Sequence, residues 1–149
     1  MRTRVLVAAL AIVALFTSQV SAGPVMFGGL GGHGPGSNST NDGALVRRLV
    51  TRGALNSPWG LALAPAGFGR FGGALLVGNF GNGHINAYDP NTGASLGPLR
   101  TTHGAPIAID GLWGLRFGNG AAAKTGELIF SAGPNHESNG LLGKLVPAG

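Results

Sequence analysis

A short phrase that occurs twice constrains this chain more than any other feature. It reads Trp-Gly-Leu-Ala-Leu from Trp59 to Leu63 and Trp-Gly-Leu-Arg-Phe from Trp113 to Phe117, which places the two tryptophans 54 residues apart. Self-similarity at a period of about 40–50 residues is the signature of repeat architectures such as β-propellers, in which each repeat forms one small sheet. The chain is therefore expected to contain two copies of one sheet-forming unit.

The composition favours strands over helices. The 149 residues include 29 Gly and 9 Pro, and only 10% are charged. Gly and Pro cost a helix interior about 1 and 3 kcal/mol relative to Ala, whereas short strands separated by turns accommodate both. Cysteine is absent, which excludes a disulfide framework and a thiolate metal site.

The first 22 residues have the pattern of a secretory signal peptide. Arg2 and Arg4 precede an uncharged apolar run over residues 5–16, and Val20-Ser21-Ala22 supplies the small residues that a signal peptidase reads. A membrane anchor is the alternative, but the run is too short to span a hydrocarbon core of roughly 30 Å comfortably. The pattern predicts a secreted or periplasmic protein without a membrane segment after cleavage.

Residues 23–43 are interpreted as a flexible linker. Gly, Ser and Asn dominate the segment, so it cannot bury enough apolar surface to offset the entropy lost on ordering. A phosphate-binding loop is the alternative, but the required Gly-Lys-Ser/Thr sequence does not occur. The cations that follow are scattered apart from the pair Arg47-Arg48. No nucleic-acid partner is therefore expected, because nucleic-acid binding needs clustered positive charge.

Residues 44–149 alternate short apolar runs with turn residues, which predicts antiparallel strands. The expected strands are residues 59–64, 74–79, 84–88 and 95–101 in a first blade (about 44–104), and 113–117, 127–132 and 141–146 in a second blade (105–149). The second blade lacks a fourth strand, and a strand over residues 45–51 is the candidate that completes it, because closed propellers often pair the two ends of the chain. The predicted fold class is all-β, with four-stranded antiparallel meanders forming an incomplete propeller of about two blades.

Several phrases in residues 45–147 resemble the C-terminal part of one protein family. They are Ser57-Pro58-Trp59-Gly60-Leu61-Ala62, Gly78-Asn79-Phe80-Gly81-Asn82-Gly83, Tyr88-Asp89, Ile109-Asp110-Gly111-Leu112-Trp113-Gly114-Leu115 and Ala132-Gly133-Pro134-Asn135. The family comprises uncharacterised exported bacterial proteins with NHL-like six-bladed β-propeller repeats. Its members are longer and carry further blades after the signal peptide, so the resemblance implies a truncated or internally deleted chain. It implies a fold and a location but no catalytic residues.

Trp59-Gly60 and Trp113-Gly114 are interpreted as structural repeat positions. Equivalent placement in both copies favours packing of the two tryptophans between blades, where a large aromatic side chain buries much surface. A carbohydrate-stacking platform is the alternative for these side chains.

Asp110 and the run Asn135-His136-Glu137 are the candidate ligand-loop residues. Asp110 lies just before the second Trp-Gly-Leu phrase, and the run lies where the second hairpin is longer than the first. Such oxygen and imidazole groups are able to bind a divalent cation or a polar ligand. The alternatives are a carboxylate that caps nearby backbone amides and a solvated loop. No cofactor is predicted, and the divalent cation stays an alternative.

The leading function hypothesis is a secreted, non-catalytic binding or structural module. Neither a Gly-x-Ser-x-Gly elbow nor a His-Glu-x-x-His motif occurs, so this chain alone is not expected to be an enzyme. One alternative is a metal-dependent lyase or hydrolase of the NHL-propeller type, formed only in a full-length or oligomeric ring. Another is a non-functional gene remnant. Because propellers use about four to eight blades, self-association that completes a ring is the partner interaction expected.

Overall fold

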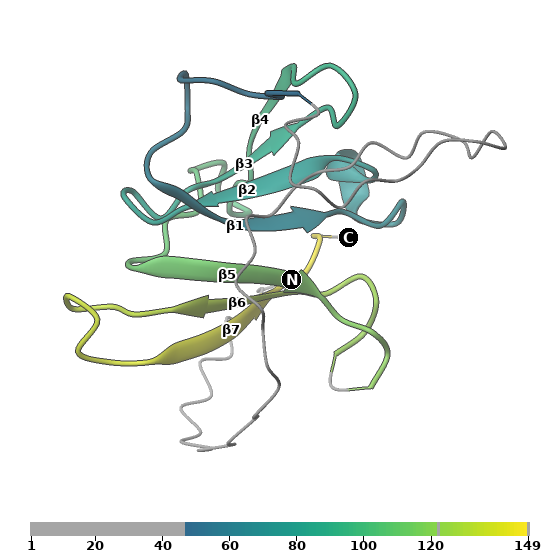
Figure 1. The fold of residues 1–149 in the computed structure, drawn as a ribbon. Coiled ribbons are helices and arrows are strands. Elements are labelled where there is room, and N and C mark those ends of the chain that lie inside the picture. The colour runs from purple at the N-terminus through teal and green to yellow at the C-terminus, as the bar shows by residue number, and fades with distance from the viewer. Residues whose placement is uncertain (1–46, 122, 149) are drawn as a thin grey trace, which may run out of the picture. The chain divides into compact units, whose positions relative to one another are not determined.

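The computed structural model describes residues 47–121 and 123–148, and these residues form two antiparallel β-sheets (Figure 1). The first sheet has the order β1-β2-β3-β4, and the second has the order β5-β6-β7. The strands are β1 (Pro58–Leu63), β2 (Leu75–Asn79), β3 (Ile85–Tyr88), β4 (Ser95–Pro98), β5 (Leu112–Phe117), β6 (Leu128–Ala132) and β7 (Leu141–Leu145). A three-residue 3-10 helix, η1 (Gly69–Phe71), follows β1. The all-β class and the antiparallel meanders predicted from the sequence are confirmed.

The helical content of the described residues is limited to η1. Nothing in residues 47–121 or 123–148 therefore has the length and apolar character of a helix that crosses a membrane. The predicted signal peptide (1–22) and linker (23–43) lie outside the described residues.

The strand predicted over residues 45–51 is wrong for the part that the structure describes. Residues 47–51 are not in a strand, and the second sheet has three strands. Leu49 and Val50 instead pack, together with Leu55, against the first sheet. Their apolar side chains become partly buried by covering a sheet face, and this contact requires no strand pairing.

The predicted turns form because Asn and Asp side chains bond to nearby backbone amides. Between β2 and β3, the Asn82 Oδ1 accepts a hydrogen bond from the His84 N–H at 3.1 Å. Between β3 and β4, the Asp89 Oδ1 accepts from the N–H groups of Asn91 and Thr92, both at 2.8 Å. Such local bonds offer the backbone an alternative to extended structure and end each strand at a defined residue.

The two copies of the repeated phrase have the same strand register. In the first sheet Leu61 pairs with Val77, and in the second sheet Leu115 pairs with Phe130. A register shift interrupts the start of the first pair of strands in both sheets. The repeat is therefore present in the structure as well as in the sequence. Equivalent positions of the two sheets can be compared on this basis.

A shared apolar core joins the two sheets. It contains Leu76 and Ile85 from the first sheet and Leu112, Leu128 and Phe130 from the second, and most of these side chains are fully buried. Because side chains alternate between the faces of a strand, these residues define one inner face on each sheet.

Two glycines on the first sheet allow β5 to approach it closely. A Cβ atom added to Gly60 would lie 2.6 Å from the Trp113 carbonyl oxygen and 2.9 Å from the Leu115 Cγ, and one added to Gly78 would lie 2.9 Å from a Leu112 methyl group. Real Cβ atoms do not approach other atoms so closely, because packed interiors leave no such overlap. The two glycines thus set how closely the sheets pack.

Gly60→Ala tests this contact. We expect the variant to lower the free energy of unfolding by about 1–3 kcal/mol, the usual cost of overpacking a core, as measured by chemical denaturation. Gly114→Ala is the matched control because Gly114 occupies the equivalent position of the second sheet, where a Cβ would meet only the Ser131 Oγ at 3.0 Å. Equal losses in the two variants would contradict the proposed role of Gly60.

The second face of the first sheet is covered by the segment that precedes β1. Leu75, Val77 and Tyr88 are buried there beneath apolar side chains of that segment. The Asn79 and Asn86 side-chain amides both donate to the same backbone carbonyl of the segment, that of residue 54, at 2.8 and 3.3 Å. Hydrogen bonds and apolar contacts thus fix the cover in place. The Tyr88 hydroxyl is buried on this face and has no hydrogen-bond partner in the described structure.

Burial raises the pKa of Tyr88 above its ordinary value of 10.0. As the pH rises past 10, the unfolded chain therefore ionises before the folded one, and the stability contributed by the neutral phenol is progressively lost. Tyr88→Phe should remove this alkaline loss. At neutral pH it should be at least as stable as the parent, because the substitution deletes a buried hydroxyl without a partner.

Tyr88 is the single tyrosine of the chain, so phenolate absorbance reports on it alone. The expected titration midpoint is higher in the native protein than in denaturant. Identical midpoints in the two states would show that this side chain is not buried as described. A Tyr88→Phe variant destabilised at neutral pH would show that the hydroxyl makes a stabilising hydrogen bond.

The outer face of the second sheet is open and largely polar. Arg116, Ile129 and Lys144 are paired across β5, β6 and β7 on this face, and Leu142 is 71% exposed. The Lys144 ammonium donates to the Glu127 carboxylate at 2.8 Å. This bond, together with one from the backbone N–H of residue 124, holds the pKa of the Glu127 carboxyl below its ordinary 4.5.

The repeat shows how this open face differs from the inner face of the first sheet. Arg116 occupies the position equivalent to Ala62, and Lys144 the position equivalent to the buried Ala87. Small apolar residues that face a second sheet in the first copy are thus replaced by charged residues in the second.

Candidate functional site

Four segments meet at the end of the sheets where β1 and β5 begin (Figure 1, left side of the view). We call them the rim: residues 56–59, 80–83, 109–111 and 133–139. Backbone hydrogen bonds connect them in series. The Phe80 N–H donates to the Ser57 carbonyl oxygen at 2.9 Å, and the Ile109 N–H donates to the Gly83 carbonyl oxygen at 3.0 Å. The Gly133 N–H donates to the Gly111 carbonyl oxygen at 2.8 Å.

Glycine is required at two junctions of the rim. A Cβ at Gly83 would lie 2.2 Å from the Ile109 carbonyl oxygen, and one at Gly111 would lie 2.2 Å from the Gly133 carbonyl oxygen. Both residues also have left-handed backbone conformations, with φ of 69° and 62°, which glycine adopts without steric cost. The junctions are therefore close contacts between backbone segments. The surface of the rim is formed by side chains at other positions.

The candidate ligand-loop residues named from the sequence are brought together on the rim. The Asp110 Oδ2 accepts a hydrogen bond from the Asn135 N–H at 3.0 Å. The Trp113 indole N–H donates to the Glu137 Oε1 at 3.2 Å. Two pairs of residues, 25 and 24 positions apart in the chain, are thus joined. The Asp110 carboxylate accepts from the backbone of the loop, and the Glu137 carboxylate accepts from an indole ring.

The enlarged hairpin contains three successive residues in the left-handed region. Asn135, His136 and Glu137 have φ of 55°, 54° and 63°. Left-handed backbone costs a residue with a side chain roughly 1–2 kcal/mol, and only Asn tolerates it readily. The turn is held by the hydrogen bond from the Asn135 N–H to Asp110 and by one from the Glu137 N–H to Gly133 O at 3.0 Å. Strained backbone of this kind is concentrated at functional sites, and here it presents exposed His136 and Glu137 side chains.

Relief of this strain is measurable. His136→Gly should raise the free energy of unfolding by about 1 kcal/mol, because glycine removes the steric cost of the left-handed conformation. Asn139→Gly is the matched control, since Asn139 lies in the same exposed loop but not in the left-handed region, and it should be neutral or destabilising. A destabilised His136→Gly variant would show that the imidazole contributes more than the strain costs.

Trp59 lies on the rim and not between the sheets. Its side chain is 67% exposed, and its ring contacts that of Phe80 with centroids 6.0 Å apart and planes tilted by 44°. The expected packing between blades is therefore wrong for Trp59. Trp59 falls at the irregularity between Pro58 and Gly60 in the pairing of β1 with β2, outside the paired register.

Trp113 occupies a different environment although its sequence position is equivalent. It is half-buried, and its ring lies over the backbone of Gly133, where a Cβ would approach it to 2.5 Å. Phe80 was not singled out in the sequence as a site residue. Its position in a turn, between Asn79 and Gly81, is the signal that an aromatic ring is placed on a loop surface.

The rim offers aromatic faces, carboxylates and amides, but no assembled metal site. No three His, Cys, Asp or Glu side chains converge as metal ligands within the described ranges, 47–121 and 123–148. Asp110 bonds through one oxygen to Asn135 of the rim, and Glu137 bonds through one oxygen to Trp113 of β5. The arrangement is suited to hydrogen bonding and stacking with a polar ligand.

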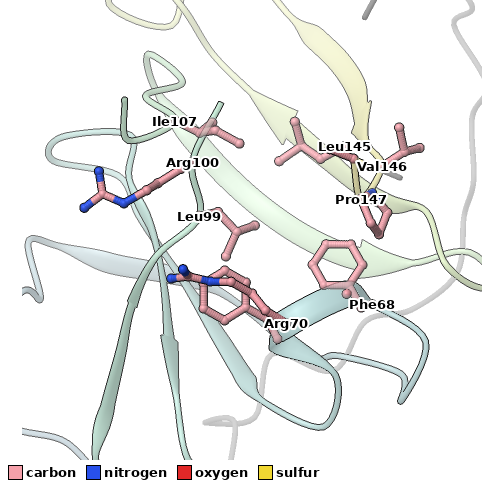
Figure 2. A pocket seen from close by; sticks show the side chains of 11 residues that line it. Phe68, Arg70, Leu99, Arg100, Ile107, Leu145, Val146 and Pro147 are labelled. Atoms are coloured by element: carbon pink, nitrogen blue, oxygen red, sulfur yellow. The ribbon is translucent and has the colours of Figure 1, made fainter. Parts of the chain in front are cut away.

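A separate cavity of about 240 Å³ lies among η1, the chain after β4 and the end of β7 (Figure 2). Leu99 and Leu145 contribute to its apolar lining. Two arginines lie beside it, but both have other contacts: the Arg70 guanidinium lies 4.4 Å above the Phe71 ring, and Arg100 donates to a backbone carbonyl at 2.7 Å. In Figure 2 Arg100 points away from the cavity. The cavity thus offers mainly apolar contact and belongs to the packing between the sheets.

The chain is similar to proteins of Acanthamoeba polyphaga mimivirus. It is 45% identical over 107 residues to uncharacterized protein L690 and 42% identical over 106 residues to uncharacterized protein R648, and each match covers 70% of this chain. Uncharacterized protein R640 is 38% identical over 76 residues, or 51% of this chain. The matches cover 27%, 25% and 14% of these relatives, so the chain spans about a quarter of their length or less. No protein-family model and no solved structure matches the chain.

These relatives correct the family expected from the sequence phrases. The phrases resemble an exported bacterial family with NHL-like repeats, but the relatives found are viral proteins. The bacterial, NHL-repeat assignment is therefore wrong, and the relatives give no support to a signal peptide or to secretion. The phrases combine short strand segments with turns rich in Gly, Asn and Pro, and such turns occur in short-stranded meanders whatever their lineage.

Proposed function

We propose that this chain is a non-catalytic binding module and that the rim is its ligand surface. The observation that carries the proposal is that the rim holds an exposed tryptophan, Trp59, and two carboxylates fixed by hydrogen bonds, Asp110 to the Asn135 N–H and Glu137 to the Trp113 indole N–H. An exposed large aromatic side chain beside fixed polar groups is the chemistry of a recognition surface, since it combines contact area with orienting hydrogen bonds.

The rigidity of the rim supports binding over a purely structural role. Its segments are joined by backbone hydrogen bonds and by glycine contacts at Gly83 and Gly111. The left-handed turn at 135–137 is maintained at a steric cost, which a loop without function has no reason to carry. A surface held in one conformation before binding loses little conformational entropy on binding.

Tryptophan fluorescence tests the proposal, because one of the two tryptophans of the chain, Trp59, lies on the rim and the other, Trp113 of β5, donates a hydrogen bond to the rim residue Glu137. A panel of neutral glycans, short peptides, ATP and spermine would be titrated against the full chain. We expect at least one class to change the emission, and Glu137→Ala to weaken that binding by about tenfold, which corresponds to about 1.4 kcal/mol. The bound compound should be recovered chemically unchanged.

Leu142→Ala is the matched control, since Leu142 is as exposed as Trp59 but lies on the open face of the second sheet. It should leave binding unchanged. Binding that is insensitive to Glu137→Ala, or equally sensitive to Leu142→Ala, would exclude the rim as the ligand surface. Recovery of a cleaved compound would overturn the non-catalytic assignment.

A further inference from the structure

We infer that the ligand of the rim is a neutral oligosaccharide, with one sugar ring stacked on Trp59 and sugar hydroxyl groups bonded to the rim carboxylates. The inference rests on the function proposed above and specifies its ligand class. It is drawn from three features of the rim: the exposure of one indole face, the unused oxygens of two carboxylates, and the charges that the rim segments carry.

The first feature is the aromatic surface. The faces of sugar rings carry C–H groups that pack on the electron-rich face of an aromatic ring, and indole provides the largest such face among side chains. Trp59 is 67% exposed, and its contact with Phe80, at 6.0 Å between centroids, supports the indole from one side. A platform fixed in this way needs little reordering before a sugar ring stacks on it.

The second feature is the free hydrogen-bonding capacity of the carboxylates. Asp110 uses its Oδ2 to accept from Asn135, and Glu137 uses its Oε1 to accept from Trp113. Within the described structure the other oxygen of each carboxylate accepts no hydrogen bond. Hydroxyl donors to a carboxylate form short, charge-assisted bonds, and a sugar presents several such donors at once. The carboxylates are held by the rim in fixed orientations, as recognition of a polyol requires.

The third feature is charge. The rim segments 56–59, 80–83, 109–111 and 133–139 contain two carboxylates and no Lys or Arg. The rim segments therefore offer no lysine or arginine to pair with a phosphate, sulfate or uronate group. The rim also extends over loops of both sheets, from Trp59 to the turn at 135–137, so the fitting ligand is a chain of sugar units that contacts both. A quaternary ammonium compound shares the preference for an aromatic face near carboxylates, and the experiment distinguishes it.

The test is isothermal titration of the full chain with a set of neutral hexasaccharides (gluco-, manno-, galacto- and N-acetylglucosamine-oligomers). The counter-probes are a sulfated hexasaccharide and tetramethylammonium. We expect at least one neutral hexasaccharide to bind. Trp59→Ala should weaken the affinity for that sugar by about tenfold or more. Trp59→Phe should weaken the affinity by less, because phenylalanine keeps part of the stacking face. Asp110→Asn should weaken binding several-fold, and Leu142→Ala should not change it. Unaltered thermal unfolding of Trp59→Ala confirms that the loss is local, as its exposure implies.

Each outcome is decisive. The carbohydrate inference is overturned if no neutral sugar binds but tetramethylammonium, a peptide or the sulfated sugar does, and if that binding is lost in Trp59→Ala. The proposed binding function stays intact in that case. Neutral-sugar binding that Trp59→Ala and Asp110→Asn leave unchanged places the sugar elsewhere and overturns the inference. Absence of any ligand sensitive to rim substitutions overturns both.

Discussion

Close packing of β1 and β2 against β5 is the contact on which the rest of the structure depends. It is possible because Gly60 and Gly78 lack side chains where Leu112 and Leu115 approach. The contact buries the inner faces of both sheets in one core, and it also brings the starts of β1 and β5 to the same end. The rim loops are neighbours for this reason, so the glycines that set the packing also assemble the candidate site.

The two sheets repeat one pattern but meet different surroundings. Both faces of the first sheet are covered, one by the second sheet and the other by the segment around residues 49–55. The second sheet has one open face, where Arg116 and Lys144 take positions that are apolar and packed in the first copy. The predicted self-association into a ring stays a prediction. Through this face it would have to desolvate the Arg116 guanidinium and the Lys144–Glu127 ion pair, which is costly unless new polar partners replace the lost water.

The site residues could be predicted in part from residue type and from the unequal lengths of the two hairpins. Asp110 and residues 135–137 were selected for their chemistry and for the extra length of one hairpin, and the structure joins them through the hydrogen bond from the Asn135 N–H to Asp110. The exposure of Trp59 was not predictable in the same way. The two tryptophans have equivalent sequence positions, but one stands beside Phe80 on the surface and the other over Gly133. A repeat in sequence specifies equivalent backbone, not equivalent neighbours.

The strands, their order and their turns follow from the amino-acid sequence, since strand alternation and the hydrogen bonds of Asn and Asp in turns act over a few residues. Local sequence patterns did not suffice for residues 45–51. Its apolar side chains fit a strand or a cover equally well, and only the position of the first sheet decided that Leu49 and Val50 cover Tyr88. Burial, exposure and the grouping of the rim depend on contacts between segments far apart in the chain, and these exist only once the sheets have packed.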